Sequence, residues 1–125
     1  MLFLPDTNIL IKAFLGKEPY ASWFVDHFRK KEIILSAIVI SEYLSGAKSS
    51  EREGFEKILT GIEICPVDVA VAKIAAGYRR EYSKKTKKVW LFDCLIAASC
   101  KVFGATLVTS DRKDYPMKNI RVKVF

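Results

Sequence analysis

Four acidic residues lie either just after a short apolar run or near the start of a predicted helix. They are Asp6, Glu42, Asp93 and Asp111. Asp6 directly follows the first apolar run, and Asp111 comes shortly after a later one. Glu42 lies near the start of one predicted helix, and Asp93 lies in the first turn of another. In an open α/β sheet, ligands bind at the carboxyl ends of the strands, where the following helices begin. We therefore expect these four carboxylates to gather at one rim of the fold.

Two of these acids interrupt apolar helix faces. Asp93 shares a helical stripe with Ile96 and Cys100, and Glu42 lies on the same face as Val39. A carboxylate on an inward face is costly unless its charge is compensated, and four close together would hold protons unless a divalent cation lay between them. Because the donors are all oxygen atoms, Mg²⁺ or Mn²⁺ is favoured over Zn²⁺. Such a site could polarise a phosphoryl oxygen and activate water, which indicates phosphodiester hydrolysis.

Each acid also has an ordinary structural explanation when it is taken alone. Asp6 is a suitable N-cap for the helix that follows it, and Asp93 suits a helix N-terminus through the macrodipole. Asp111 is typical of a turn, and Glu42 could pair with a lysine. These separate explanations leave the shared position of the four acids unexplained, and that shared position depends on the predicted fold.

Short apolar runs alternate with amphipathic segments along the chain. The runs predict strands at residues 1–4, 32–35, 62–65, 105–108 and 120–124. Apolar residues at helical spacing predict helices from residue 6 to Gly16 and around residues 20–28, 41–47, 50–59, 69–82 and 91–103. Strands that are continuously apolar and separated by helices are typical of a mainly parallel sheet covered on both faces. We therefore expect one α/β domain over residues 1–125.

Composition narrows the class of protein further. Half of the 125 residues are hydrophobic and 28% are charged, which excludes a disordered chain. No apolar run approaches the ~20 residues of a membrane helix, and the first residues lack the basic region of a signal peptide. Three cysteines without CxxC spacing argue against a disulfide framework and a thiolate metal site, so we expect a cytoplasmic protein. The net charge of +7 suggests a polyanionic partner or serves solubility alone.

Four motifs carry a resemblance to a known family. They are DTNILI at residues 6–11, SEYLSGA at 41–47, DCLIAA at 93–98 and LVTSDRKDY at 107–115. In order and spacing they resemble the PIN-domain family, and most closely the compact VapC ribonuclease toxins of VapBC toxin–antitoxin modules. The resemblance extends over essentially the whole chain.

The resemblance implies a three-layer α/β/α fold whose five-stranded, mainly parallel sheet has the order 3-2-1-4-5. It implies a Mg²⁺- or Mn²⁺-dependent endoribonuclease that cuts RNA, forms a homodimer and pairs with a cognate VapB-like antitoxin, without a membrane. Two alternatives stay open. One is a PIN-domain nuclease that processes RNA without an antitoxin, and the other is a non-catalytic RNA- or protein-binding module.

The resemblance also suggests roles for individual residues. Asp6, Glu42 and Asp93 match the family's main acidic positions, and Asp111 matches a fourth position that is Asp or Asn. Asp114 matches a weaker fifth position, where a turn or capping role is equally reasonable. We expect Asp6 and Asp93 to bind the metal directly, with Glu42 and Asp111 completing the site directly or through water. The predicted supporting residues are Thr7, Asn8, Thr109, Ser110 and Asp114.

A basic stretch precedes the predicted helix at residues 91–103. It contains Arg79, Arg80, Lys84, Lys85, Lys87 and Lys88. This stretch could hold RNA phosphates beside the metal site, with Trp90 available to stack on a base. It could equally be a solvated helix end whose lysines favour the C-terminal dipole.

Overall fold

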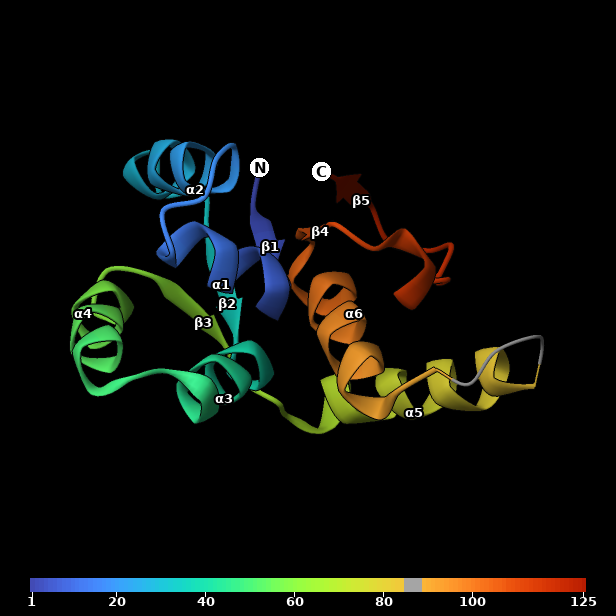
Figure 1. Ribbon diagram of the computed structural model, residues 1–125. Coiled ribbons are helices and arrows are strands. Elements are labelled where there is room, and N and C mark those ends of the chain that lie inside the picture. The colour runs from blue at the N-terminus through green and yellow to red at the C-terminus, as the bar shows by residue number, and fades with distance from the viewer. Residues whose placement is uncertain (85–88) are drawn as a thin grey trace.

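Parallel strands alternate with helices in the computed structural model, which describes residues 1–84 and 89–125 (Figure 1). The strands are β1 (Phe3–Pro5), β2 (Ile34–Ser36), β3 (Glu63–Cys65), β4 (Thr106–Thr109) and β5 (Val122–Val124). The helices are α1 (Thr7–Phe14), α2 (Tyr20–Arg29), α3 (Ala37–Gly46), α4 (Ser49–Leu59), α5 (Val69–Ser83) and α6 (Leu91–Phe103), with a short 3₁₀ turn η1 (Arg112–Asp114). The predicted α/β class is confirmed.

The strands form two parallel sheets that meet at an isolated bridge. The first sheet has the order β1-β4-β5 and pairs Leu4 with Leu107, and the second pairs β2 with β3. The sheets join where Phe3 bridges to Ile33 and the Phe3 N–H donates to the Glu32 carbonyl, at 2.7 Å. This arrangement agrees with the order 3-2-1-4-5, and the two sheets confirm its β1-β4-β5 and β2-β3 neighbours.

The core lies around the central strands and the inner faces of the helices. All four residues of β4 and all three of β2 are buried, as the continuous apolar runs predicted. Helices α5 and α6 pack along each other on the side of β4, and α1 packs on α2 (Figure 1). The three cysteines are unpaired and buried, and burial raises the pKa of Cys65 to about 12. They are core residues.

Local signals set the ends of the long helices. The Asp68 carboxylate accepts a hydrogen bond from the Val71 N–H at 3.0 Å and caps α5. Helix α6 has the predicted bounds and ends at Gly104, which is in the left-handed conformation with φ of 66°. None of the helices in the described residues has the length and apolar composition needed to cross a membrane.

The start of α3 corrects one prediction. The Ser36 hydroxyl accepts a hydrogen bond from the Ile38 N–H at 3.0 Å, so the helix begins at Ala37 rather than at residue 41. The apolar, β-branched residues that follow Ser36 suit a strand as well as a helix, and the serine cap decides for the helix. Glu42 therefore lies beyond the first turn of α3, and its predicted place near the helix start is wrong.

Candidate active site

Asp6 stands at the point where β1 gives way to α1. Its side chain is 6% exposed, and both carboxylate oxygens accept hydrogen bonds. Oδ1 accepts from the Ile9 N–H at 3.0 Å as an N-cap, and Oδ2 accepts from the Thr109 hydroxyl at 2.6 Å. Thr109 reaches Asp6 because β1 and β4 are adjacent. Burial raises the pKa of Asp6, although these two hydrogen bonds oppose the shift.

Asp93 lies in the first turn of α6, as predicted. Its carboxylate is partly buried, and Oδ1 accepts a long hydrogen bond from the Tyr115 hydroxyl at 3.4 Å. Burial raises the pKa of Asp93 to about 6, and the negative charges of Asp114, Glu42 and Asp6 act in the same direction. Asp93 therefore lies within electrostatic reach of acids from three other segments.

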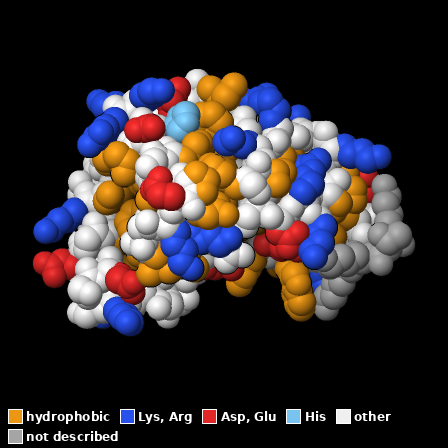
Figure 2. Space-filling model, turned by 45° about the horizontal axis from the view of Figure 1, so that its top comes forward, with side chains coloured by type: hydrophobic (Ala, Val, Ile, Leu, Met, Phe, Trp, Pro, Cys, Tyr) orange, Lys and Arg blue, Asp and Glu red, His pale blue; other side chains and the backbone are white. Residues whose placement is uncertain are grey.

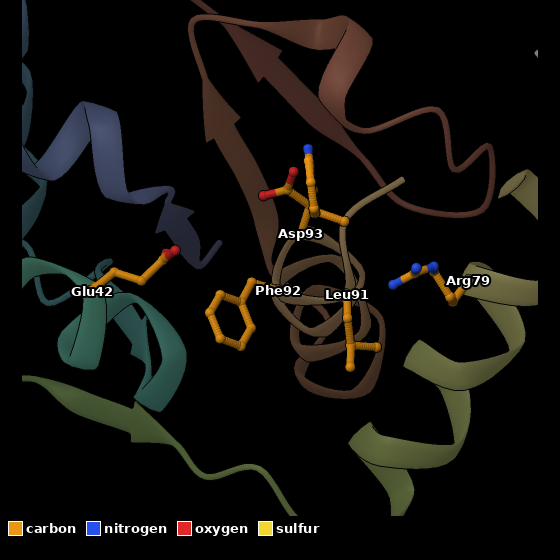
Figure 3. Close-up of a pocket in the computed structure, with 6 residues that line it drawn as sticks. Glu42, Arg79, Leu91, Phe92 and Asp93 are labelled. Atoms are coloured by element: carbon orange, nitrogen blue, oxygen red, sulfur yellow. The ribbon is translucent and has the colours of Figure 1, made fainter. Parts of the chain in front are cut away.

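Glu42 points from α3 toward this cluster (Figure 3). The Thr7 hydroxyl, at the start of α1, donates a hydrogen bond to Glu42 Oε1. Thr7 was predicted to support the site, and the structure shows that it holds the carboxylate of Glu42. The contact links α1 to α3 and sets Glu42 on the same side of the fold as Asp6 and Asp93.

The turn after β4 contains two acids, Asp111 and Asp114, which take different parts in the site. The charge of Asp114 raises the pKa of both Asp6 and Asp93. The backbone of Asp111 holds the turn, because its N–H donates to the Thr109 hydroxyl at 3.0 Å and its carbonyl accepts from the Asp114 N–H at 3.2 Å. The carboxylate of Asp111 as a ligand stays a prediction.

The residues Asp6, Glu42, Asp93 and Asp114 are called the carboxylate cluster below. Each of the first three comes from a different helix or helix cap, and Asp114 comes from η1. Burial and the charges of neighbouring acids raise the pKa of Asp93 and of Asp6. A divalent cation relieves such an arrangement, and an all-oxygen donor set suits Mg²⁺ or Mn²⁺. Among the described residues, no three acidic, histidine or cysteine side chains converge closely enough to ligate one ion as they stand. The residue types therefore fit a divalent cation, with hydroxyls of Thr7 and Thr109 holding two of the acids.

Two residues of the site were not singled out from the sequence. Tyr115 is 3% exposed, and burial followed by the charges of the carboxylate cluster raises its pKa. Its place directly after Asp114 in the fourth motif was the available signal. Lys12 donates to the Ser110 hydroxyl at 3.3 Å, and its positive charge lowers the pKa of Asp6. Nothing in the sequence distinguishes Lys12 from the other lysines, because its role depends on how α1 meets the end of β4.

The remaining sequence-predicted residues fall into three groups. Ser110 contacts Lys12, as described, whereas Asn8 is exposed on α1. Arg79 lines a pocket of about 380 Å³ with Trp90 and the two acids Glu42 and Asp93. Arg80 and Lys84 are exposed at the end of α5, and Lys85, Lys87 and Lys88 lie outside the described residues. Figure 2 shows Lys and Arg side chains spread over its face rather than gathered in one patch.

The sequence model of the PIN domain family matches residues 3–121. The chain belongs to the PIN domain family. Two curated relatives of this PIN domain are ribonucleases of Mycobacterium tuberculosis. VapC19 is 28% identical over 115 residues, covering 91% of this chain and 92% of that protein. VapC10 is 25% identical over 116 residues, covering 93% and 87%.

Solved structures with the same fold include VapBC2 and FitAB, both bound to DNA. VapBC2 from Rickettsia felis, bound to a DNA fragment from its promoter, has a TM-score of 0.84 at 23% identity, covering 100% of this PIN domain and 99% of that chain. FitAB bound to the IR36 DNA fragment has a TM-score of 0.78 at 25% identity, covering 98% and 94%. These matches confirm the PIN-like α/β fold and the predicted resemblance to VapC proteins.

Proposed function

We propose that this PIN domain is a divalent-cation-dependent endoribonuclease. The observation that carries the proposal is the carboxylate cluster. Burial raises the pKa of Asp93 and Asp6, the charges of Asp114, Glu42 and Asp6 raise that of Asp93 further, and the charge of Asp114 raises that of Asp6 further. Such a cluster is unfavourable for folding alone, so a function that uses it is the simplest reason for its presence. The curated relatives named ribonuclease, aligned over nearly the whole chain, support RNA as the substrate.

The cation would be held by Asp6 and Asp93, with Glu42, Asp111 and Asp114 completing the site directly or through water. When bound, Mg²⁺ or Mn²⁺ would polarise a phosphoryl oxygen and lower the pKa of a water molecule. The protein's own part is positioning. Hydrogen bonds from Thr109 and Thr7 fix Asp6 and Glu42 before RNA arrives, which lowers the cost of organising the site. The net charge of +7 attracts the RNA backbone.

We also propose that the chain acts in the cytoplasm as the toxin of a toxin–antitoxin pair, as a homodimer that a VapB-like antitoxin inhibits. The support is the full-length structural similarity to VapBC complexes. Unpaired buried cysteines suit a reducing compartment. Expression of the active chain in a bacterial host should arrest growth, and co-expression of a cognate antitoxin should restore it. Growth that continues while RNA is still cut in vitro would favour the RNA-processing nuclease.

Cleavage of RNA by the purified protein tests the ribonuclease proposal. Cleavage is expected in Mg²⁺ or Mn²⁺ and should be abolished by EDTA and by Asp93→Asn. Asp26→Asn is the matched control, because Asp26 is an exposed acid on α2 outside the carboxylate cluster. This variant should cleave RNA like the wild type. Cleavage that survives Asp93→Asn would contradict the proposal, and no cleavage of any RNA would favour a non-catalytic binding module.

A further inference from the structure

A pocket opens directly beside the carboxylate cluster, and its walls differ in chemistry. Glu42 and Asp93 line one part, while Arg79 of α5 and the first residues of α6 line the rest (Figure 3). Its volume of about 380 Å³ is in the range of small-molecule sites. A group in this pocket would therefore lie next to whatever the carboxylate cluster acts on.

Three consecutive large apolar side chains form the exposed wall of this pocket. Trp90 is 63% exposed, Leu91 is 44% exposed and Phe92 is 55% exposed. Large apolar side chains that stay exposed beside a concave place mark a binding surface. Aromatic faces beside a pocket suit a flat, weakly polar ring as the occupant.

Arg79 supplies a positive charge to the same pocket. Its guanidinium extends from α5 toward Leu91 (Figure 3). Burial raises the pKa of Cys94, one turn into α6, and the positive charge of Arg79 opposes that rise. A guanidinium can stack on an aromatic ring or pair with a phosphate group. A flat ring joined to a phosphate is the chemistry of a nucleotide, and the pocket presents a partner for each part.

We propose that this pocket holds one unpaired nucleobase of the RNA strand, stacked on Trp90 and Phe92, with Arg79 on an adjoining phosphate, next to the bond that the carboxylate cluster acts on. The inference rests on the proposed ribonuclease function and deepens it. A base that is paired in a duplex cannot enter the pocket without leaving its partner and its stack. The occupant is therefore a base outside any base pair.

Tryptophan fluorescence tests the proposal without cleavage. The chain has two tryptophans, so in Trp23→Phe protein the signal comes from Trp90 alone. In EDTA, a short single-stranded RNA should quench this fluorescence, whereas an abasic strand of the same length should bind without quenching it. Base–aromatic stacking predicts that the RNA binds about 5- to 100-fold more tightly than the abasic strand.

Variants of the pocket complete the test. Trp90→Ala and Phe92→Ala should each lower the affinity for the base-containing strand several-fold and leave the affinity for the abasic strand unchanged. Both side chains are mostly exposed, so their truncation empties no core. Val102→Ala is the matched control, because Val102 is an exposed apolar residue at the far end of the same helix, and it should change neither affinity.

Three results would overturn the proposal. The first is that the wild type binds the base-containing strand and the abasic strand with equal affinity. The second is that Trp90→Ala lowers the affinity for both strands equally. The third is that Trp90→Ala changes the protein from dimer to monomer in sedimentation while it still binds the base-containing strand more tightly. The last result would assign this face to a second copy of the chain. RNA cleavage in Mg²⁺, measured on the same wild-type preparation, separates the two ideas: cleavage without base preference overturns the pocket alone, and base preference without cleavage overturns the ribonuclease alone.

Discussion

At the scale of single residues, the site is an arrangement of negative charge that the fold alone does not compensate. Asp93 is the clearest case, because burial and three neighbouring acids all raise its pKa. Motif positions in the sequence indicated Asp6, Glu42 and Asp93, and Thr109 was expected to support them. Two features were not foreseen: the contact of Tyr115 with Asp93 and the effect of the charge of Asp114 on the pKa of Asp93. Both depend on where η1 folds back, since Tyr115 lies 22 residues along the chain from Asp93.

Removing the charge of Asp93 should stabilise the protein when no cation is present. The pKa of Asp93 is raised from 3.8 to about 6, so the folded state binds this proton more tightly than the unfolded state. The free energy of unfolding therefore falls as pH rises from about 4 to about 6, and the loss is complete above that window. In EDTA at pH 7.5, Asp93→Asn should raise the free energy of unfolding by about 1–3 kcal/mol, with little difference left at pH 4.

Urea denaturation at the two pH values measures this effect. Asp26→Asn, which removes an exposed acid, should show no comparable gain. An Asp93→Asn protein that is no more stable than the wild type at pH 7.5 would show that burial and the neighbouring acids do not destabilise the charged form of Asp93.

The hydroxyl of Thr109 should matter more than its size. Thr109→Val removes the hydrogen bonds to Asp6 Oδ2 and from the Asp111 N–H in a fully buried place, at a cost of about 1–3 kcal/mol. Thr106→Val, in the same strand, is the matched control. The Thr106 hydroxyl accepts a long contact of 3.4 Å from Arg121, so its removal should cost less. Thermal unfolding of both variants compares them, and equal losses would mean that Asp6 does not depend on Thr109.

At the scale of elements, the sequence predicted helices better where a specific end signal was present. Asp68 caps the start of α5 and Gly104 ends α6, and these two helices lie within one residue of the predicted ranges 69–82 and 91–103. The start of α3 was misplaced because an apolar, β-branched run suits a strand as well as a buried helix, and the cap at Ser36 decides between them. Glu42 was placed at the correct rim although its position in the helix was wrong, because α3 packs against α1 and α6.

Gly104 should resist substitution for a backbone reason alone. A Cβ at this position would meet nothing within 4 Å, but φ of 66° is strained for any other common residue. We expect Gly104→Ala to lower the free energy of unfolding by about 1 kcal/mol. Gly54→Ala, inside α4 with open space around its Cβ, should raise it by about 0.5–1 kcal/mol. Chemical denaturation should give opposite signs for the two variants, and a loss in both would contradict the backbone explanation.

At the scale of the whole molecule, the strand order brings the acids together and the net charge bears on the kind of partner. The adjacency of β1 and β4 followed from the resemblance and brings Asp6 to the end of β4. The single bridge between β1 and β2 could not be predicted, because the number of paired residues depends on strand twist and not on apolar runs. The net charge indicated a polyanionic partner, yet Figure 2 shows Lys and Arg side chains spread over the face that it displays. In the described part of the chain, Arg79 lines the pocket beside the carboxylate cluster, whereas Lys12 already contacts Ser110.

The salt dependence of RNA binding should therefore respond to Arg79 in particular. For single strands, each phosphate contact changes the slope of log affinity against log salt by about 0.7. Arg79→Ala should make the slope shallower by about that amount, measured by fluorescence anisotropy in EDTA. Arg29→Ala, an exposed cation at the end of α2, should leave it unchanged. Equal slopes for the wild type and both variants would show that Arg79 does not contact an RNA phosphate.

The account depends above all on the carboxylate cluster acting together on a divalent cation. Calorimetric titration of Mn²⁺ into the protein without RNA tests this most directly. We expect binding to the wild type and to Asp26→Asn, and a loss of at least about tenfold in affinity in Asp93→Asn, as is common when a ligand shell is disturbed. No binding to the wild type, or equal binding to all three proteins, would contradict a cation site at the cluster.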